Sequence, residues 1–268
     1  MRYKPAVIYS ALTVGTGLLS KSEALSPLAF GLSIFIPALF YVLSKEDGPG
    51  AALLITAVAL GVLALYDYKL AADLSALPVM GLLLYFGKNR LSTENLVLLG
   101  AALLFASAVL EEIAFGLPEP VRKVELFVKY RFGFYALSSL LLSYFMTAVA
   151  QGITGEKWKV EELRFGFWSV ILFLLSGTVF LIIKEGPLHE MGINLLIASI
   201  SLFTVQGISI ILYAVRRLGS LWKLTLLISA LLFPILILGF STFLGLLDQA
   251  IDFRKKLYEG GKDGSNPD

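Results

Sequence analysis

The sequence predicts an all-α protein, a polytopic integral membrane helix bundle with eight or nine transmembrane helices. Of its 268 residues, 57% are hydrophobic and only 16% are charged, whereas soluble domains carry about 25% charged residues. The apolar residues also come in runs of about 17–25, which is the length that crosses a bilayer as a helix. A soluble domain of this size could not hide so much apolar side chain, because its surface must be covered with polar groups.

Nine apolar runs are the candidate spans. They are Pro5–Ser20, Ser26–Leu43, Gly50–Tyr68, Ala71–Phe86, Glu94–Phe115, Phe132–Gly152, Phe165–Ile183, Ile193–Val215 and Leu221–Leu247. The first and fourth are short for a full crossing. The last is long and contains Pro234, which lacks an N–H and kinks a helix, so it is either one bent span or two short ones. We expect a single transmembrane domain over residues 1–256 and a disordered polar tail over residues 257–268.

The N-terminus has the charged start and apolar body of a signal peptide, but we interpret it as an uncleaved first helix because many spans follow. Most Lys and Arg residues of the short loops fall on one side if every span crosses once. The basic cluster at 254–256 lies on the same side as these loops if the chain crosses the membrane eight times, and on the opposite side if it crosses nine times. The positive-inside rule favours eight crossings. We therefore expect a multi-pass protein of the bacterial cytoplasmic membrane with both termini in the cytoplasm.

The longest connection between spans mixes apolar and basic residues. It reads "GLPEPVRKVELFVKYRFG" and carries Arg122, Lys123, Lys129 and Arg131 among valine, leucine and aromatic residues. This mixture is typical of an amphipathic segment that lies in the membrane interface.

Charge and residue usage exclude several function classes. A net charge of +2 without a basic stripe argues against a nucleic-acid partner. The chain has no cysteine and a single histidine, His189, so cysteine chemistry and multi-histidine metal sites are excluded. We expect no metal and no cofactor, and we interpret His189 as a solvated loop residue.

Two adjacent acids, Glu111 and Glu112, lie near the end of an apolar run. From Leu96 to Leu110 a helix covers about 22 Å, which nearly crosses the roughly 30 Å of hydrocarbon. The acids are therefore interfacial residues at a helix end, or contacts to a cavity or partner, or catalytic residues. The third alternative is the weakest. The stretch resembles the EExxxR motif of CAAX-type intramembrane proteases, but Gly116 stands where the arginine belongs. We expect no enzymatic function.

Gln206 lies near the middle of the eighth candidate span. An amide in hydrocarbon needs hydrogen-bond partners, so such a residue faces the interior of the bundle. Gln206 therefore either hydrogen-bonds another helix or lines a ligand cavity, and Gly207 beside it permits close helix approach.

Two further segments are candidates for docking a partner. Ala11 and Gly15 form a small-xxx-small pair in the first span, which serves either packing within the bundle or docking of a partner helix. At the C-terminus, Asp248, Asp252 and Arg254 alternate with apolar residues at helical spacing. They belong either to a helix that leaves the membrane or to a docking surface.

The C-terminal half resembles the YybS-like family of bacterial polytopic membrane proteins, whose function is not settled. The residues that carry the resemblance are Asn194 at the start of a helix, Gln206 and Gly207 in its middle, and Gly245, Asp248, Asp252, Phe253 and Arg254 at the exit. "LRFGFWSVILFLL" also resembles that family's tryptophan-bearing segment, with Gly166-Phe167 in place of the expected proline. Asn194 thereby joins Gln206, Glu111 and Glu112 as a candidate ligand or cavity residue.

This family is distantly similar to the substrate-binding S-components of energy-coupling-factor transporters and to the rod-shape scaffold MreD. The resemblance by itself implies little about activity, but in S-components a small-xxx-small patch on the first helix docks the coupling subunit. Ala11 and Gly15 are the matching positions here. We expect a subunit that acts through a membrane partner and binds a small solute, with a cell-envelope scaffold that transports no ligand as the alternative. The lipid bilayer is the other expected partner.

Overall fold

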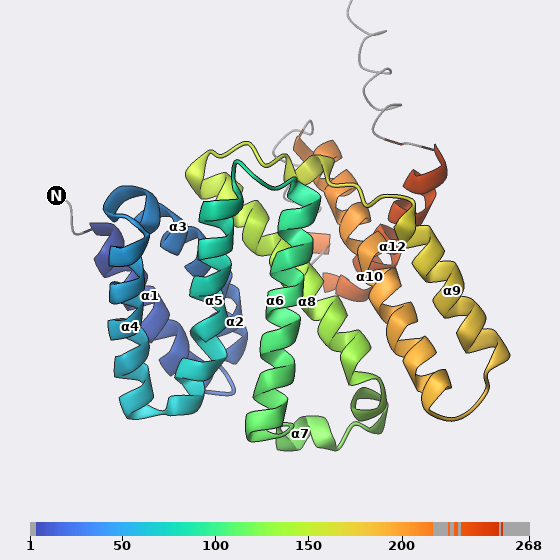
Figure 1. Cartoon of the computed structure of the whole chain (residues 1–268), viewed down its shortest axis with the longest axis horizontal. Helices are drawn as coiled ribbons and strands as arrows, with labels where there is room; N and C mark the ends of the chain where they lie inside the picture. Colours follow the sequence, from blue (N-terminus) through green and yellow to red (C-terminus); the bar gives the residue numbers. More distant parts are fainter. Residues whose placement is uncertain (1–3, 217–224, 226–227, 230–231, 252, 254–268) are drawn as a thin grey trace, which may run out of the picture. The chain divides into compact units, whose positions relative to one another are not determined.

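The computed structural model describes residues 4–216, 225, 228–229, 232–251 and 253 (Figure 1). Within them the chain is helical apart from turns, connections and one 3-10 turn, and it forms no strand. The predicted all-α bundle is confirmed. Seven helices in this part of the chain are long and apolar enough to cross a membrane. Helices α1, with 17 residues, and α9, with 15, are shorter, so eight or nine crossings remains a prediction.

The helices form two compact units that interleave along the chain. Unit 1 combines Met1–Glu119 with Ser139–Trp158, and unit 2 combines Pro120–Ser138 with Lys159–Asp268. The single domain over residues 1–256 remains a prediction. The tail over residues 257–268 lies outside the described residues.

Unit 1 contains six helices and the second half of a seventh. They are α1 (Lys4–Ser20), α2 (Ser26–Ser33), α3 (Ile36–Asp47), α4 (Pro49–Tyr66), α5 (Tyr68–Gly87), α6 (Thr93–Phe115) and the end of α8 (Glu125–Thr154). Local sequence explains several boundaries. The Asp67 carboxylate caps α5 by accepting from the Lys69 N–H, and the Ser92 hydroxyl caps α6 by accepting from the Asn95 N–H. Pro37 lacks an N–H and lies in the first turn of α3, so α2 and α3 form one interrupted span.

Small residues allow the helices of unit 1 to pack closely. A methyl group added at Gly81 would meet the Phe40 ring, and one added at Gly100 would meet Ser143 and Met80. The Ser143 hydroxyl donates to the Val97 carbonyl at 2.8 Å, which joins α8 to α6. Helices in a bilayer associate through such packing and hydrogen bonds, since lipid provides no hydrophobic drive between them.

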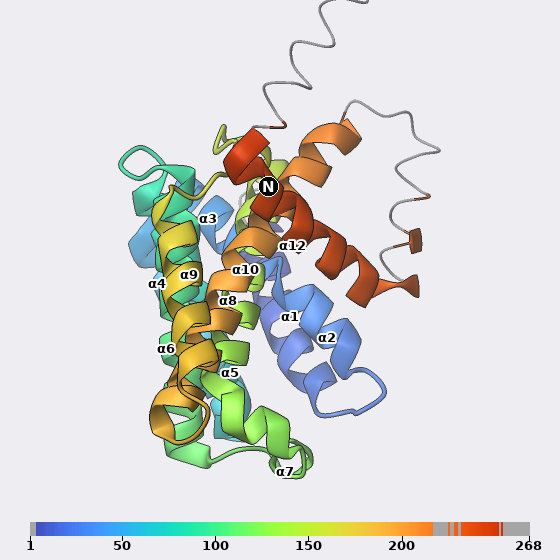
Figure 2. The same cartoon turned by 90° about the vertical axis from the view of Figure 1, so that its right-hand side faces the viewer.

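Unit 2 contains the remaining elements. They are α7 (Glu119–Arg122, beginning at the boundary), the start of α8, the 3-10 turn η1 (Val160–Glu162), α9 (Trp168–Ile182), α10 (Pro187–Arg216) and α12 (Pro234–Ile251). Helices α9 and α10 form a hairpin (Figure 1), and α12 crosses α10 obliquely (Figure 2). Pro234 is the first residue of α12, a position at which the missing N–H of proline is tolerated.

Large apolar side chains cover the outside of the helices. Leu65 is 92% exposed, Ile235 is 83% exposed and Ile113 is 76% exposed. Such side chains on long apolar helices face lipid in a multi-pass membrane protein, where the helix satisfies its own backbone hydrogen bonds. The predicted bilayer environment is therefore supported by the structure.

Candidate functional site

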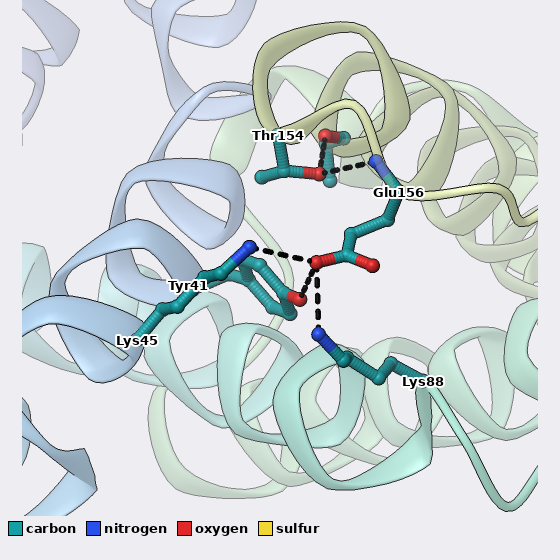
Figure 3. A network of polar contacts seen from close by, with 6 residues as sticks. Tyr41, Lys45, Lys88, Thr154 and Glu156 are labelled. Atoms are coloured by element: carbon teal, nitrogen blue, oxygen red, sulfur yellow. Dashed lines mark hydrogen bonds and ion pairs between the residues drawn. The ribbon is translucent and has the colours of Figure 1, made fainter.

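A carboxylate binds three donors at one end of unit 1 (Figure 3). The Oε1 atom of Glu156 accepts from the Tyr41 hydroxyl at 2.6 Å, from Lys88 Nζ at 2.9 Å and from Lys45 Nζ at 3.1 Å. The Thr154 hydroxyl, at the end of α8, accepts from the Glu156 N–H at 3.3 Å. Figure 3 shows the second carboxylate oxygen turned away from the donors. We call these five residues the Glu156 cluster.

Electrostatics in the Glu156 cluster favours the ionised carboxylate. The pKa of Glu156 falls from 4.5 to about 2, first because the Tyr41 hydroxyl bonds to it and then because Lys88 does. The pKa of Lys88 is raised, mainly by the Glu156 carboxylate. Glu156 is 20% exposed, so the ion pairs are partly shielded from water. The cluster therefore holds its charges throughout the neutral and mildly acidic range.

Aromatic contacts also hold the segment around Glu156 against the helices of unit 1. The Tyr41 ring packs edge-on against Trp158, with centroids 5.6 Å apart, and against Tyr85. The Trp158 carbonyl accepts from the Thr93 hydroxyl at the start of α6. Residues Gly155–Trp158 thus tie together the ends of α3, α5 and α6. The sequence gives little sign of this arrangement, because Glu156 stands in a polar connection that is notable only for its basic residues.

A second polar network is buried in unit 2. Gln206 and Asp248 are both 0% exposed, and the Gln206 Nε2 donates to Asp248 Oδ2 at 2.9 Å. The Gln206 Oε1 accepts from the Phe165 N–H at 3.1 Å and from Gln249 Nε2 at 3.0 Å. Asp248 Oδ1 accepts from the Phe253 N–H at 2.9 Å. We call these residues the Gln206 cluster. It joins α10, α12 and the segment that leads into α9.

Two glycines allow this network to form. A methyl group at Gly207 would overlap the Ser241 carbonyl, and one at Gly245 would overlap the Phe203 carbonyl. The backbones of α10 and α12 are therefore in direct contact, which brings residues 42 positions apart into hydrogen-bond range. The sequence left two roles for Gln206, bonding another helix or lining a ligand cavity. Its side chain makes three hydrogen bonds, and two of them are to residues of α12.

Of the three predicted C-terminal docking residues, the structure describes only Asp248. Asp248 is buried and bonded to Gln206 within unit 2. Asp252 and Arg254 lie outside the described residues.

Asn194 joins α10 to α8 near the start of both helices. Its Oδ1 accepts from the Gly133 N–H at 2.7 Å, and its Nδ2 donates to the Glu190 carbonyl at 2.8 Å. Close approach of the two helices is needed here, since a methyl group at Gly133 would meet the Asn194 backbone. Both polar ends of the amide are therefore used within unit 2.

Glu111 and Glu112 lie in the last two turns of α6, which ends at Phe115. Both are half-buried, and Glu111 Oε1 accepts from the Ser107 hydroxyl at 3.2 Å. Gly116 follows with φ of 73°, a positive value that glycine adopts readily because it has no Cβ. The two acids therefore lie at a helix end, and the choice between an interfacial and a cavity role stays a prediction.

Ala11 lines an apolar groove between α1 and α4. The groove has a volume of about 550 Å³ and is lined by Ala6, Val7, Ser10, Ala11, Val14, Leu54, Ile55 and Val58. Gly15 lies one turn further along α1, and nothing lies within 4 Å of a methyl group placed there. We call this surface the α1/α4 groove.

The other side of α1 carries the polar groups. The Tyr9 hydroxyl shares a hydrogen bond of 2.8 Å with Thr56 of α4, and the Thr13 hydroxyl donates to the Tyr9 carbonyl. Tyr9 and Thr13 are fully buried. The side of α1 that faces outward is therefore the apolar side with small residues.

His189 is half-buried in the first turn of α10, and is not the solvated loop residue that the sequence predicted. Its Nδ1 lies 2.6 Å from the Ile183 carbonyl, and its ring stacks on Phe180. Among the described residues, no three His, Asp or Glu side chains are grouped as metal ligands.

No protein-family model, curated protein or solved structure matches this chain. The resemblance to the YybS-like family therefore remains a prediction.

Proposed function

We propose that this multi-pass membrane protein works by binding a transmembrane helix of another membrane protein in the α1/α4 groove. The observation that carries the proposal is an outward-facing apolar groove between α1 and α4 of unit 1, in which α1 contributes the small residues Ala6, Ser10 and Ala11. Small residues such as Ala6 and Ala11 let a second helix approach closely, which is how helices associate in lipid.

The Ser10 hydroxyl favours a helix over a lipid chain as the occupant. Serine and threonine in apolar helices normally donate to a carbonyl one turn earlier, as Thr13 and Thr56 do. Ser10 lines the groove and has no hydrogen-bond partner within the described part of the chain. An unpaired hydroxyl in hydrocarbon is unfavourable. An acyl chain has no hydrogen-bond acceptor for the Ser10 hydroxyl, whereas a helix has backbone and side-chain oxygen atoms that can accept from it.

Within unit 1, the distribution of basic residues favours a cytoplasmic N-terminus. Helices α1 and α4 run in the same direction, because Tyr9 bonds Thr56 near one end and Lys21 pairs with Asp67 at the other. Unit 1 has Lys4, Lys45, Lys88, Arg90 and Lys157 at the end where α1 begins, against Lys21 and Lys69 at the opposite end. The positive-inside rule assigns the first end to the cytoplasm. A cytoplasmic C-terminus and a bacterial inner membrane belong to the same proposal.

The experiment is affinity purification from mildly solubilised native membranes, followed by quantitative mass spectrometry. The variants are Ala11→Leu, which fills the groove, and Ala106→Leu, a matched change at an exposed position of α6. We expect a membrane protein that co-purifies with the wild type and with the Ala106 variant but is reduced about tenfold or more by Ala11→Leu. A photo-reactive residue at position 11 should cross-link to that same protein.

Equal recovery with both leucine variants, or cross-linking only to a second copy of this chain, contradicts the proposal. The identity of the partner then separates two roles. A coupling subunit with ATPase subunits favours solute transport of the S-component kind. Cell-wall or division proteins favour the scaffold.

A further inference from the structure

The connection between α6 and α8 forms a bent segment of unit 2. Helix α7 ends at Arg122, and α8 begins at Glu125. Tyr130 interrupts α8 with non-helical angles of φ −113° and ψ 23°, which turns its first residues away from the axis of the rest. Figure 1 shows α7 in the connection between the end of α6 and the start of α8. We call residues Val121–Phe132 the elbow.

Charge places the elbow at the level of the lipid head groups. From Phe132 to Thr154, α8 has no charged residue and covers about 34 Å, slightly more than the hydrocarbon thickness of roughly 30 Å. Lys129, within the elbow, pairs with Glu190 in the first turn of α10 at 3.6 Å. The next charged residue of α10 is Arg216, at its far end. Both helices therefore enter the hydrocarbon just beyond the elbow.

Packing holds the elbow in a defined shape. The Phe127 ring stacks on Phe134 with centroids 5.3 Å apart and packs edge-on against Tyr135. The Arg131 guanidinium donates to the Val128 carbonyl at 2.7 Å and lies over the Phe132 ring. The exposed side chains are thus presented on an ordered scaffold.

The exposed side chains at the start of the elbow are two basic residues followed by two apolar ones, with the exposed Glu125 between the apolar pair. Val124 is 53% exposed and Leu126 is 63% exposed, and they follow the exposed Arg122 and Lys123. From Glu119 to Phe132 the chain carries four basic and two acidic residues. Apolar side chains that reach hydrocarbon beside cations that reach phosphates are the pattern of a segment that binds an anionic membrane surface.

We propose that the elbow binds the head groups of anionic phospholipids. Arg122 and Lys123 contact the phosphates, while Val124 and Leu126 enter the acyl layer beside them. An acidic protein would be attracted by the same charges, but it would leave the two apolar side chains without an apolar environment. The site belongs to unit 2 and is independent of the α1/α4 groove.

The test uses the absence of native cysteine. A Leu126→Cys variant carries a single polarity-sensitive dye, and the purified protein in detergent is titrated with phosphatidylglycerol, phosphatidylcholine or inorganic phosphate. We expect a blue shift of the dye with phosphatidylglycerol at a concentration several-fold lower than with phosphatidylcholine, and none with phosphate. Adding Arg122→Gln and Lys123→Gln should raise the phosphatidylglycerol midpoint about fivefold or more. Adding Arg90→Gln, at an exposed position of unit 1, should leave the midpoint unchanged.

Three results would overturn the proposal. Equal midpoints for the two lipids show that charge plays no part. A midpoint that the double glutamine variant leaves unchanged shows that Arg122 and Lys123 are not the contacts. A response to inorganic phosphate at the same concentration indicates a site for a free anion and not a lipid surface.

Discussion

Replacing Glu156 by glutamine removes a charge that three donors share while keeping the shape of the side chain. The shift in the pKa of Glu156 from 4.5 to about 2 corresponds to about 3 kcal/mol in favour of the ionised carboxylate. Solvent screens part of this, because Lys45 is 55% exposed and Lys88 is 27% exposed. We therefore expect Glu156→Gln to lower the free energy of unfolding by about 1–2 kcal/mol at neutral pH.

The pH dependence gives a second, independent check. The pKa of Glu156 is depressed in the folded state, so its contribution is fully present above the ordinary pKa of 4.5 and is lost as the pH falls toward about 2. The difference in unfolding free energy between wild type and Glu156→Gln should therefore be constant from pH 7 to about 5. It should then shrink steadily with further acidification.

The assay is unfolding by sodium dodecyl sulfate in mixed micelles, followed by circular dichroism. Glu46→Gln is the matched control, since Glu46 is an exposed carboxylate of α3 outside the Glu156 cluster. Lys88→Met should destabilise more than Lys45→Met, because Lys88 is the less exposed partner. A Glu156→Gln protein as stable as the wild type at pH 7 would refute the reasoning. A difference that persists unchanged at pH 3 would also refute it.

Two further predictions concern the crossing of α10 and α12. Gly207→Ala should destabilise the protein by about 2 kcal/mol or more, because the added methyl group overlaps the Ser241 backbone. Gly239→Ala should have little effect, since open space surrounds that position. Unfolding of both variants by sodium dodecyl sulfate checks this prediction, and equal stability of the two variants contradicts it. Gln206→Leu should cost about 2–4 kcal/mol in the same assay, since it leaves the buried Asp248 carboxylate without one of its donors. A neutral effect would show that the Gln206 cluster does not stabilise the fold.

The spans were predictable because each is a long apolar run. The run Glu94–Phe115 differs from α6 by one residue at its start. The predicted start Phe132 lies just past the break in α8 at Tyr130, whereas the short helical stretch before that break, which begins at Glu125, was not predicted because charged residues interrupt the apolar run there. Similarly, α10 begins at Pro187 and not at Ile193, since proline is well suited to the first turn of a helix.

The sites were less predictable because they depend on contacts between distant residues. Gln206 and Asp248 were each singled out by polarity in an apolar segment, but their pairing follows from the direct backbone contact at Gly207. Glu156 was missed altogether. Its partners Tyr41 and Lys45 lie more than 100 positions away, and no local pattern connects them.

The interleaving of the two units along the chain has a consequence for biogenesis. A ribosome delivers residues 120–138, which belong to unit 2, before residues 139–158, which complete unit 1. The Gly133 N–H is therefore synthesised before its acceptor, the side-chain oxygen of Asn194, which lies 61 positions later in the chain. During insertion, Glu156 and Trp158, which complete contacts within unit 1, therefore emerge before Asn194, which contacts the first part of α8. Shortened chains that stop after Trp158 would therefore expose an unfinished polar helix start to the membrane.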